Sequence, residues 1–154
     1  KIIIFGCWYG VLADILTLRL KDTNILCNDI DKEAISWCMR KYHTDTNRME
    51  DFVYETRVDL VINTVTEHLT QELYDKWYEK IPKGTYFIIQ GNNDFKEPDH
   101  VRAFSTLNEF NKLNKVENTL HTGTLSYEGP WDMVDNKPTY YERYMTIGFK
   151  SEYN

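Results

Sequence analysis

Short apolar runs alternate with segments of helical periodicity along the chain, and this alternation constrains the fold most strongly. The first run, residues 2–5, is continuously apolar and ends at Gly6, which is typical of a strand buried on both faces. Further apolar runs cover residues 24–28, 58–65 and 86–90, and helical spacing covers residues 11–20, 31–41, 70–80 and 105–113. This alternation predicts a Rossmann-like α/β fold, a mostly parallel sheet with helices on both faces.

Two further regions complete the predicted sheet. The polar stretch after residue 42 gives a weak third strand at residues 48–51. Near the end of the chain, residues 116–127 and 144–150 predict two strands of an antiparallel hairpin. Gly129–Pro130 and Lys137–Pro138 predict a long loop between these two strands.

Size, charge and cysteine content restrict the class of protein. The 154 residues fit a single domain, 1–154, with a core of its own. A net charge of −6 disfavours nucleic acid as a partner. Three cysteines without a C-x-x-C pair predict free thiols in a reducing compartment. Because no apolar run is long enough to cross a membrane and the first residues resemble a strand rather than a leader, we expect a cytoplasmic protein.

The loop after the first predicted strand is the first candidate ligand site, because ligands of such folds bind beyond the carboxyl ends of the strands. It reads Gly6, Cys7, Trp8, Tyr9, Gly10, with a glycine at each end that permits a tight turn and close approach of a ligand. Trp8 stands where a dinucleotide-binding loop has its middle glycine. The loop therefore suits a ligand without phosphate better than a pyrophosphate, and an ordinary strand-to-helix turn is the alternative.

An acidic residue follows this loop at an informative distance. Asp29 ends the second predicted strand, about 20 residues beyond Gly10, where an acid in this fold accepts hydrogen bonds from ribose hydroxyls. A carboxylate suits this task because it only accepts and has two oxygens. The alternative for Asp29 is a solvated turn residue, and Asp31 is expected to cap the next helix.

Together these segments resemble the motifs of class I S-adenosylmethionine-dependent methyltransferases. More closely, the chain is similar to methyltransferase-like proteins with the segments G-x-W-Y-G, D-I-D, I-N-T-x-x-E-H and Q-x-N-(D/N), which here occupy residues 6–10, 29–31, 62–68 and 90–93. The resemblance covers nearly the whole chain. It implies the fold and S-adenosylmethionine as cofactor, and it names no substrate. Trp8 and a short segment between the second and fourth strands depart from the pattern.

The resemblance also implies a set of cofactor contacts. Asp51 is then the candidate for the adenine amino group and Phe52 for packing on the ring, with a solvated acid beside a core phenylalanine as the alternative. Asn63 and Thr64 suit the methionine part of the cofactor or the acceptor. The implied cofactor-binding residues are Gly6, Cys7, Trp8, Tyr9, Gly10, Asp29, Ile30, Asp51, Phe52, Asn63 and Thr64.

Glu67 and His68 are the candidate catalytic residues, because they follow a buried strand where the transferred methyl group would lie. Either side chain can take the proton of a hydroxyl or ammonium acceptor. The alternative is a helix N-terminus capped by Thr66. The side chains of adjacent residues such as Glu67 and His68 point in different directions on a helix, and no H-x-x-x-H motif accompanies this pair, so we expect no metal site. His100 is expected at the surface or in packing.

The sequence therefore favours S-adenosylmethionine-dependent methyl transfer to a small-molecule acceptor. Two alternatives stay open. One keeps the cofactor and changes the reaction, to cleavage or aminopropyl transfer. The other is a nucleoside-binding domain without turnover, since fold alone does not fix function. Neither the acceptor nor the oligomeric state follows from the sequence.

Overall fold

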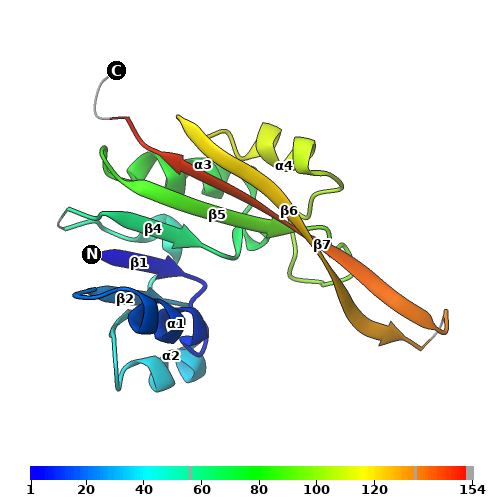
Figure 1. The fold of residues 1–154 in the computed structure, drawn as a ribbon, viewed down its shortest axis with the longest axis horizontal. Helices are drawn as coiled ribbons and strands as arrows, with labels where there is room; N and C mark the ends of the chain where they lie inside the picture. The colour runs from blue at the N-terminus through cyan, green and yellow to red at the C-terminus, as the bar shows by residue number, and fades with distance from the viewer. Residues whose placement is uncertain (56, 134, 152–154) are drawn as a thin grey trace.

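A computed structural model describes residues 1–55, 57–133 and 135–151, and these form a seven-stranded sheet with the order β3-β2-β1-β4-β5-β7-β6 (Figure 1). Strands β1 to β5 pair with one another in parallel, whereas β7 is antiparallel to both β5 and β6. This confirms the predicted Rossmann-like sheet with a C-terminal antiparallel hairpin. The strands are β1 (Ile2–Phe5), β2 (Ile25–Asn28), β3 (His43–Asp45), β4 (Leu60–Asn63), β5 (Tyr86–Asn92), β6 (Thr119–Asp132) and β7 (Lys137–Phe149).

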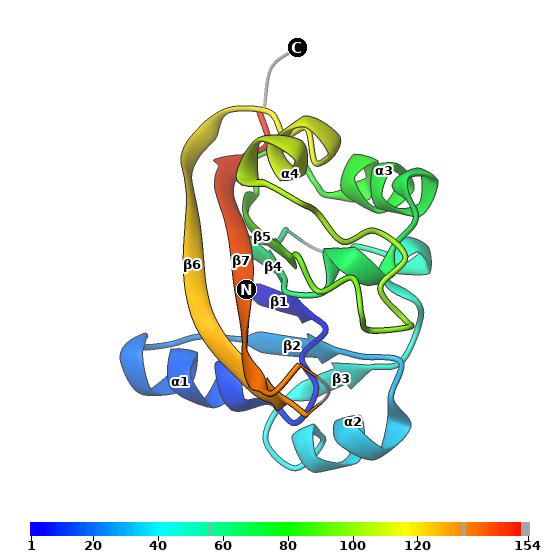
Figure 2. The ribbon, with the colours of Figure 1, turned by 90° about the vertical axis from the view of Figure 1, so that its right-hand side faces the viewer.

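Helices cover both faces of this sheet, as predicted. Alternate residues of β1 point to opposite faces, so Ile4 packs in the cluster with residues of α1 and α2, and Phe5 in the cluster with residues of α3 and α4. Figure 2 shows α1 and α2 at one end of the molecule and α3 and α4 at the other. The helices are α1 (Val11–Arg19), α2 (Lys32–Cys38), α3 (Gln71–Lys80) and α4 (Leu107–Leu113).

Two helix starts agree with the sequence. The Asp31 side chain accepts hydrogen bonds from the backbone N–H groups of Glu33 and Ala34, at 2.9 and 3.2 Å, and so caps α2. Thr70 caps α3 in the same way. Helix α2 ends at Cys38, three residues earlier than predicted.

The third strand lies elsewhere than predicted. Residues 49–51 form a short 3-10 helix, η1 (Met49–Asp51), and β3 (His43–Asp45) is the strand that pairs with β2. The prediction of a strand at 48–51 was wrong because β3 is a partly exposed edge strand, and its three polar residues carry no apolar run.

The hairpin strands are much longer than predicted. Strand β6 continues through Gly129–Pro130 and β7 begins at Lys137, so no long loop separates them. The register shifts between Glu128 and Trp131, and such an irregularity in an edge strand tolerates the missing N–H of proline. The far half of the hairpin projects beyond the other strands (Figure 1). Within the described ranges, the helices are all too short or too polar to cross a bilayer.

Candidate functional site

A cleft of about 760 Å³ opens at the carboxyl ends of the parallel strands. The strand order reverses between β1 and β4, and ligands of open α/β sheets bind at such a switch point. The volume lies in the range of small-molecule sites, about 300–1,000 Å³. The predicted site residues that line this cleft are Gly6, Trp8, Asp29, Ile30, Thr64, Glu67 and His68.

The loop after β1 is shaped by its glycines. Gly6 and Gly10 have positive φ angles of 70° and 80°, and Trp8 has a φ of 50°. A Cβ atom at Gly6 would lie 2.4 Å from Cγ2 of Val65. Gly6 is therefore required by the packing of this loop against the loop after β4, besides any ligand. The Trp8 side chain is exposed at the rim of the cleft.

The Asp29 carboxylate is fixed by the backbone around it. Its Oδ2 accepts from the Trp8 N–H at 2.8 Å, and its Oδ1 accepts from the Asp31 N–H at 3.0 Å. Each oxygen keeps a further lone pair that a ligand hydroxyl can use. The next residue, Ile30, is 64% exposed and offers an apolar surface beside the carboxylate.

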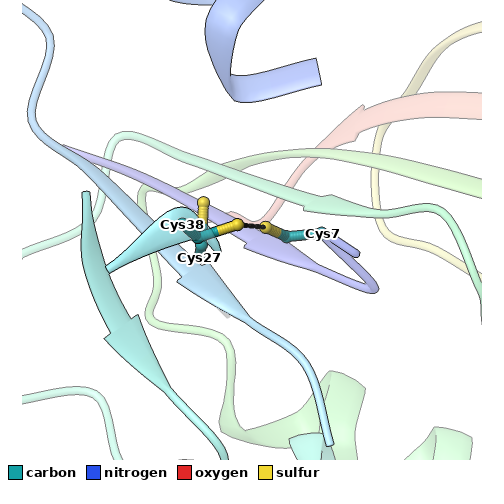
Figure 3. Close-up of side chains that lie close together, drawn as sticks. All are labelled: Cys7, Cys27 and Cys38. Carbon is teal, nitrogen blue, oxygen red and sulfur yellow. Dashed lines mark hydrogen bonds between the residues drawn. The ribbon is translucent and has the colours of Figure 1, made fainter. Parts of the chain in front are cut away.

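Three cysteines pack beneath the glycine loop (Figure 3). Cys7, Cys27 and Cys38 are buried free thiols, as predicted, and the Sγ atoms of Cys7 and Cys38 are 3.6 Å apart. Cys38 Sγ also donates to the Trp8 carbonyl at 3.2 Å. Burial raises the pKa of the Cys38 thiol, which favours the uncharged form. Cys7 therefore stabilises the loop through its buried packing and does not line the cleft.

Other predicted contacts lie beside the cleft. The Tyr9 ring is half exposed next to Trp8, and Gly10 directly precedes α1. Asn63 is fully buried: its Oδ1 accepts from the Val65 N–H at 3.0 Å, and its Nδ2 donates to Met49 Sδ at 3.2 Å. Asn63 therefore shapes the turn after β4.

The structure does not bring Asp51 and Phe52 to the cleft. Asp51 accepts from Lys76 Nζ at 2.8 Å, and Phe52 packs edge-on against Phe5 with ring centroids 5.2 Å apart. Met49 and Glu50, from the same 3-10 helix, line the cleft instead. A sequence pattern cannot show which side of so short a helix faces inward.

Glu67 provides a buried carboxylate at the other end of the cleft. Its side chain is 2% exposed, Oε1 accepts from Asn92 Nδ2 at 2.6 Å, and Oε2 has no hydrogen-bond partner among the described residues. Burial raises the pKa of the Glu67 carboxyl. Glu67 lies on the 3-10 helix η2 (Thr66–His68), and the Thr66 hydroxyl donates to the Gln90 carbonyl at 2.6 Å rather than capping α3. The helix-cap alternative for Thr66 is thus wrong.

Two histidines meet beside Glu67. The rings of His68 and His100 are 4.9 Å apart and nearly perpendicular. His100 comes from the loop after β5, where it packs against His68, one of the two positions expected for it, and it also lines the cleft. It is 32 residues from His68 in the sequence, with no shared motif, so only the fold of the loop reveals the pairing.

Two arginines complete this end of the site, and no sequence pattern indicated either of them. Arg143 of β7 lines the cleft and donates to the Thr64 carbonyl at 3.1 Å. Arg102 is buried: its backbone N–H donates to the Glu67 carbonyl at 3.0 Å. Burial lowers the pKa of Arg102 to about 10. The guanidinium donates to Gln71 Oε1, Asn114 Oδ1 and the Thr66 carbonyl, at 2.8, 2.8 and 3.3 Å.

Comparison with known proteins identifies the fold. No family model and no curated sequence matches the chain. Among solved structures, TehB from Haemophilus influenzae superposes with a TM-score of 0.72 at 13% identity, over 97% of this chain and 57% of that one. NodS, an N-methyltransferase from Bradyrhizobium japonicum in complex with S-adenosylhomocysteine, gives 0.64 at 13% identity over 96% and 76%. The plantazolicin methyltransferase BpumL, also with S-adenosylhomocysteine, gives 0.61 at 16% identity over 97% and 76%.

These likenesses show that the chain has the fold of S-adenosylmethionine-dependent methyltransferases. The chain spans little more than half the length of TehB, and more of the other two. At these identities the comparison establishes the fold alone, and the site has to carry any argument about function.

Proposed function

We propose that the chain binds S-adenosylmethionine in this cleft and transfers its methyl group to a small-molecule acceptor. The observation that carries the proposal is the pairing of two carboxylates in one cleft. Asp29 stands at the end of β2 with lone pairs left for a ligand, and Glu67 stands after β4 with one buried oxygen that has no partner in the described parts of the chain. The fold, which is that of S-adenosylmethionine-dependent methyltransferases, supports the proposal.

The residues around Asp29 fit the nucleoside part of the cofactor. The Asp29 carboxylate would accept from the ribose hydroxyls, and the apolar surfaces of Ile30 and Met49 lie in the same cleft for the adenine ring. Gly6, which has no side chain, lets the chain pass close to the ligand. When bound, S-adenosylmethionine supplies a methyl group on a positively charged sulfur.

The residues around Glu67 fit the acceptor. Methyl transfer depends chiefly on holding the acceptor close to the methyl group, and buried side chains in the wall of the cleft can hold it there. A hydroxyl or ammonium acceptor also loses a proton, and the Glu67 carboxylate, which lines the cleft, would take it. Asn92 holds one of its oxygens at 2.6 Å and so orients the carboxylate. A small acceptor agrees with the cleft volume and with the negative charge of the chain.

The turnover test compares the wild type with Glu67→Gln. Both proteins are incubated with S-adenosylmethionine and pools of phenols, alcohols and amines, and release of S-adenosylhomocysteine is measured. We expect release with at least one pool for the wild type and a loss of about 100-fold or more for Glu67→Gln, with cofactor binding retained. Equal release by the two proteins contradicts the role of Glu67. Binding without turnover in every pool favours a nucleoside-binding domain.

The cofactor site has its own matched pair of variants. Asp29→Asn removes the charge from hydrogen bonds worth about 1.5–3 kcal/mol each, so affinity for S-adenosylhomocysteine should fall about 10- to 100-fold. Asp51→Asn is the control, because Asp51 pairs with Lys76 outside the cleft. An unchanged affinity for Asp29→Asn, or a larger loss for Asp51→Asn, contradicts the proposed orientation of the nucleoside.

A further inference from the structure

Glu67, His68 and His100 form a cluster of potential metal ligands. One ligand atom from each lies within 4.8 Å of those of the other two. Two ligands of a tetrahedral zinc ion are about 3.3 Å apart, as bond lengths of about 2.0–2.2 Å require, so the side chains need to approach by at most about 1.5 Å. His68 is exposed and His100 is half-buried, and both have room for such a change.

Both imidazoles are held in the tautomer that binds metal through Nε2. His68 Nδ1 lies 3.1 Å from the Asp99 carbonyl, and His100 Nδ1 lies 2.8 Å from the Asp94 carbonyl. Because a carbonyl oxygen only accepts, each Nδ1 carries the proton, and the lone pair stays on Nε2. Metal-binding histidines in proteins are oriented by this kind of hydrogen bond.

Glu67 supplies the observation that points to a missing ligand. Its side chain is 2% exposed, and Oε1 accepts from the Asn92 amide. Within the described ranges Oε2 is buried without a hydrogen bond, an arrangement that costs free energy unless a proton or a cation is present. The hydrogen bond from Asn92 orients the carboxylate, as the outer partners of a metal site do.

We propose that Glu67, His68 and His100 bind one divalent transition-metal ion, of the class represented by zinc, at the acceptor end of the cleft. Two neutral imidazoles and one carboxylate match ions of intermediate softness and leave at least one coordination position open. This proposal departs from the expectation from sequence that the chain has no metal site, which considered Glu67 and His68 without His100.

The open position deepens the proposed function, on which this part of the inference rests. All three residues line the cleft that also contains Asp29. An acceptor that carries a hydroxyl or phenol group would bind the ion through that oxygen. The cation lowers the pKa of the bound hydroxyl, so its proton passes to water and Glu67 stays a ligand instead of taking the proton. The acceptor class is then an oxygen nucleophile rather than an amine.

The test measures metal binding without cofactor or acceptor. Tag-free, metal-stripped protein is titrated with Zn²⁺ by calorimetry and with Co²⁺ by visible absorption. We expect one ion per chain, and for Co²⁺ the d–d bands of nitrogen and oxygen ligands. A strong thiolate-to-cobalt band, which we do not expect, would show that the three cysteines bind the ion instead. His100→Ala and Glu67→Gln should weaken binding at least 100-fold, and Asn92→Ala about 10- to 100-fold.

His43→Ala is the matched control, because His43 is an exposed histidine on β3, away from the cleft. Circular dichroism of each variant shows that the fold is intact. Absence of binding by the wild type, a thiolate band, or equal binding by His100→Ala and His43→Ala overturns the inference. Titration of the same metal-free protein with S-adenosylhomocysteine tests the proposed function separately, so that either can fail alone.

Discussion

Replacing Arg102 with methionine removes the group that ties the loop after β5 to the rest of the site. Methionine keeps much of the buried volume but leaves three acceptors without their donor: Gln71, Asn114 and the Thr66 carbonyl. Each buried acceptor without a partner costs about 1–3 kcal/mol, and the loss of a buried charge offsets part of this sum. We expect the free energy of unfolding to fall by about 3–4 kcal/mol.

Scanning calorimetry measures the effect of this substitution. For a chain of this size, 1 kcal/mol corresponds to about 2–4 °C, so Tm should fall by about 6–16 °C. Arg57→Met is the control, because the Arg57 side chain is 86% exposed and its Nε lies 3.6 Å from Asp59. An exposed pair contributes at most about 1 kcal/mol. Equal shifts in Tm for the two variants would refute the role given to Arg102.

Three further predictions test the packing around the site. Gly6→Ala should lower the free energy of unfolding by about 2–4 kcal/mol, because the new Cβ overlaps Val65 and the φ angle of residue 6 is positive. Adding Val65→Ala to this variant should recover the part of the loss that is due to overlap. Urea titration of the single and the double variant measures both effects. Lys150→Met should lower the free energy of unfolding by about 2–3 kcal/mol in the same assay, because the buried ammonium donates to two carbonyls at the end of α3. An unchanged free energy of unfolding would contradict this role of Lys150 as a cap of α3. The three buried cysteines should resist maleimide in the native state and all react in denaturant, and native labelling seen by mass spectrometry would contradict their burial.

The parallel sheet could be predicted because its strands are buried on both faces. Such strands appear as unbroken apolar runs, as in Ile2–Phe5 and residues 60–62, and their order along the chain fixes the alternation with helices. An edge strand such as His43–Asp45 has no such run. The length of the hairpin was missed because Gly129 and Pro130 are typical of loops, and here they lie at an irregularity in an edge strand.

The candidate site was predictable where a residue follows a strand closely. Asp29 directly follows β2, and Glu67 lies on the short helix η2 just after β4; both lie in the cleft because the carboxyl ends of parallel strands meet at one edge of the sheet. His100 and Arg143 depend on the course of a long loop and on the register of β7 against β5, which no local pattern specifies. The metal-binding group we propose therefore became visible only in three dimensions.

Calorimetric titration of the purified chain with S-adenosylhomocysteine tests the central claim most directly. This ligand is the product of methyl transfer, and its binding needs no acceptor and no turnover, so the measurement addresses the cleft alone. We predict one site per chain with a dissociation constant in the micromolar range, on the order of −8 kcal/mol of binding free energy. No heat of binding from a chain shown by circular dichroism to be folded would contradict the account, and would leave the methyltransferase fold without its cofactor.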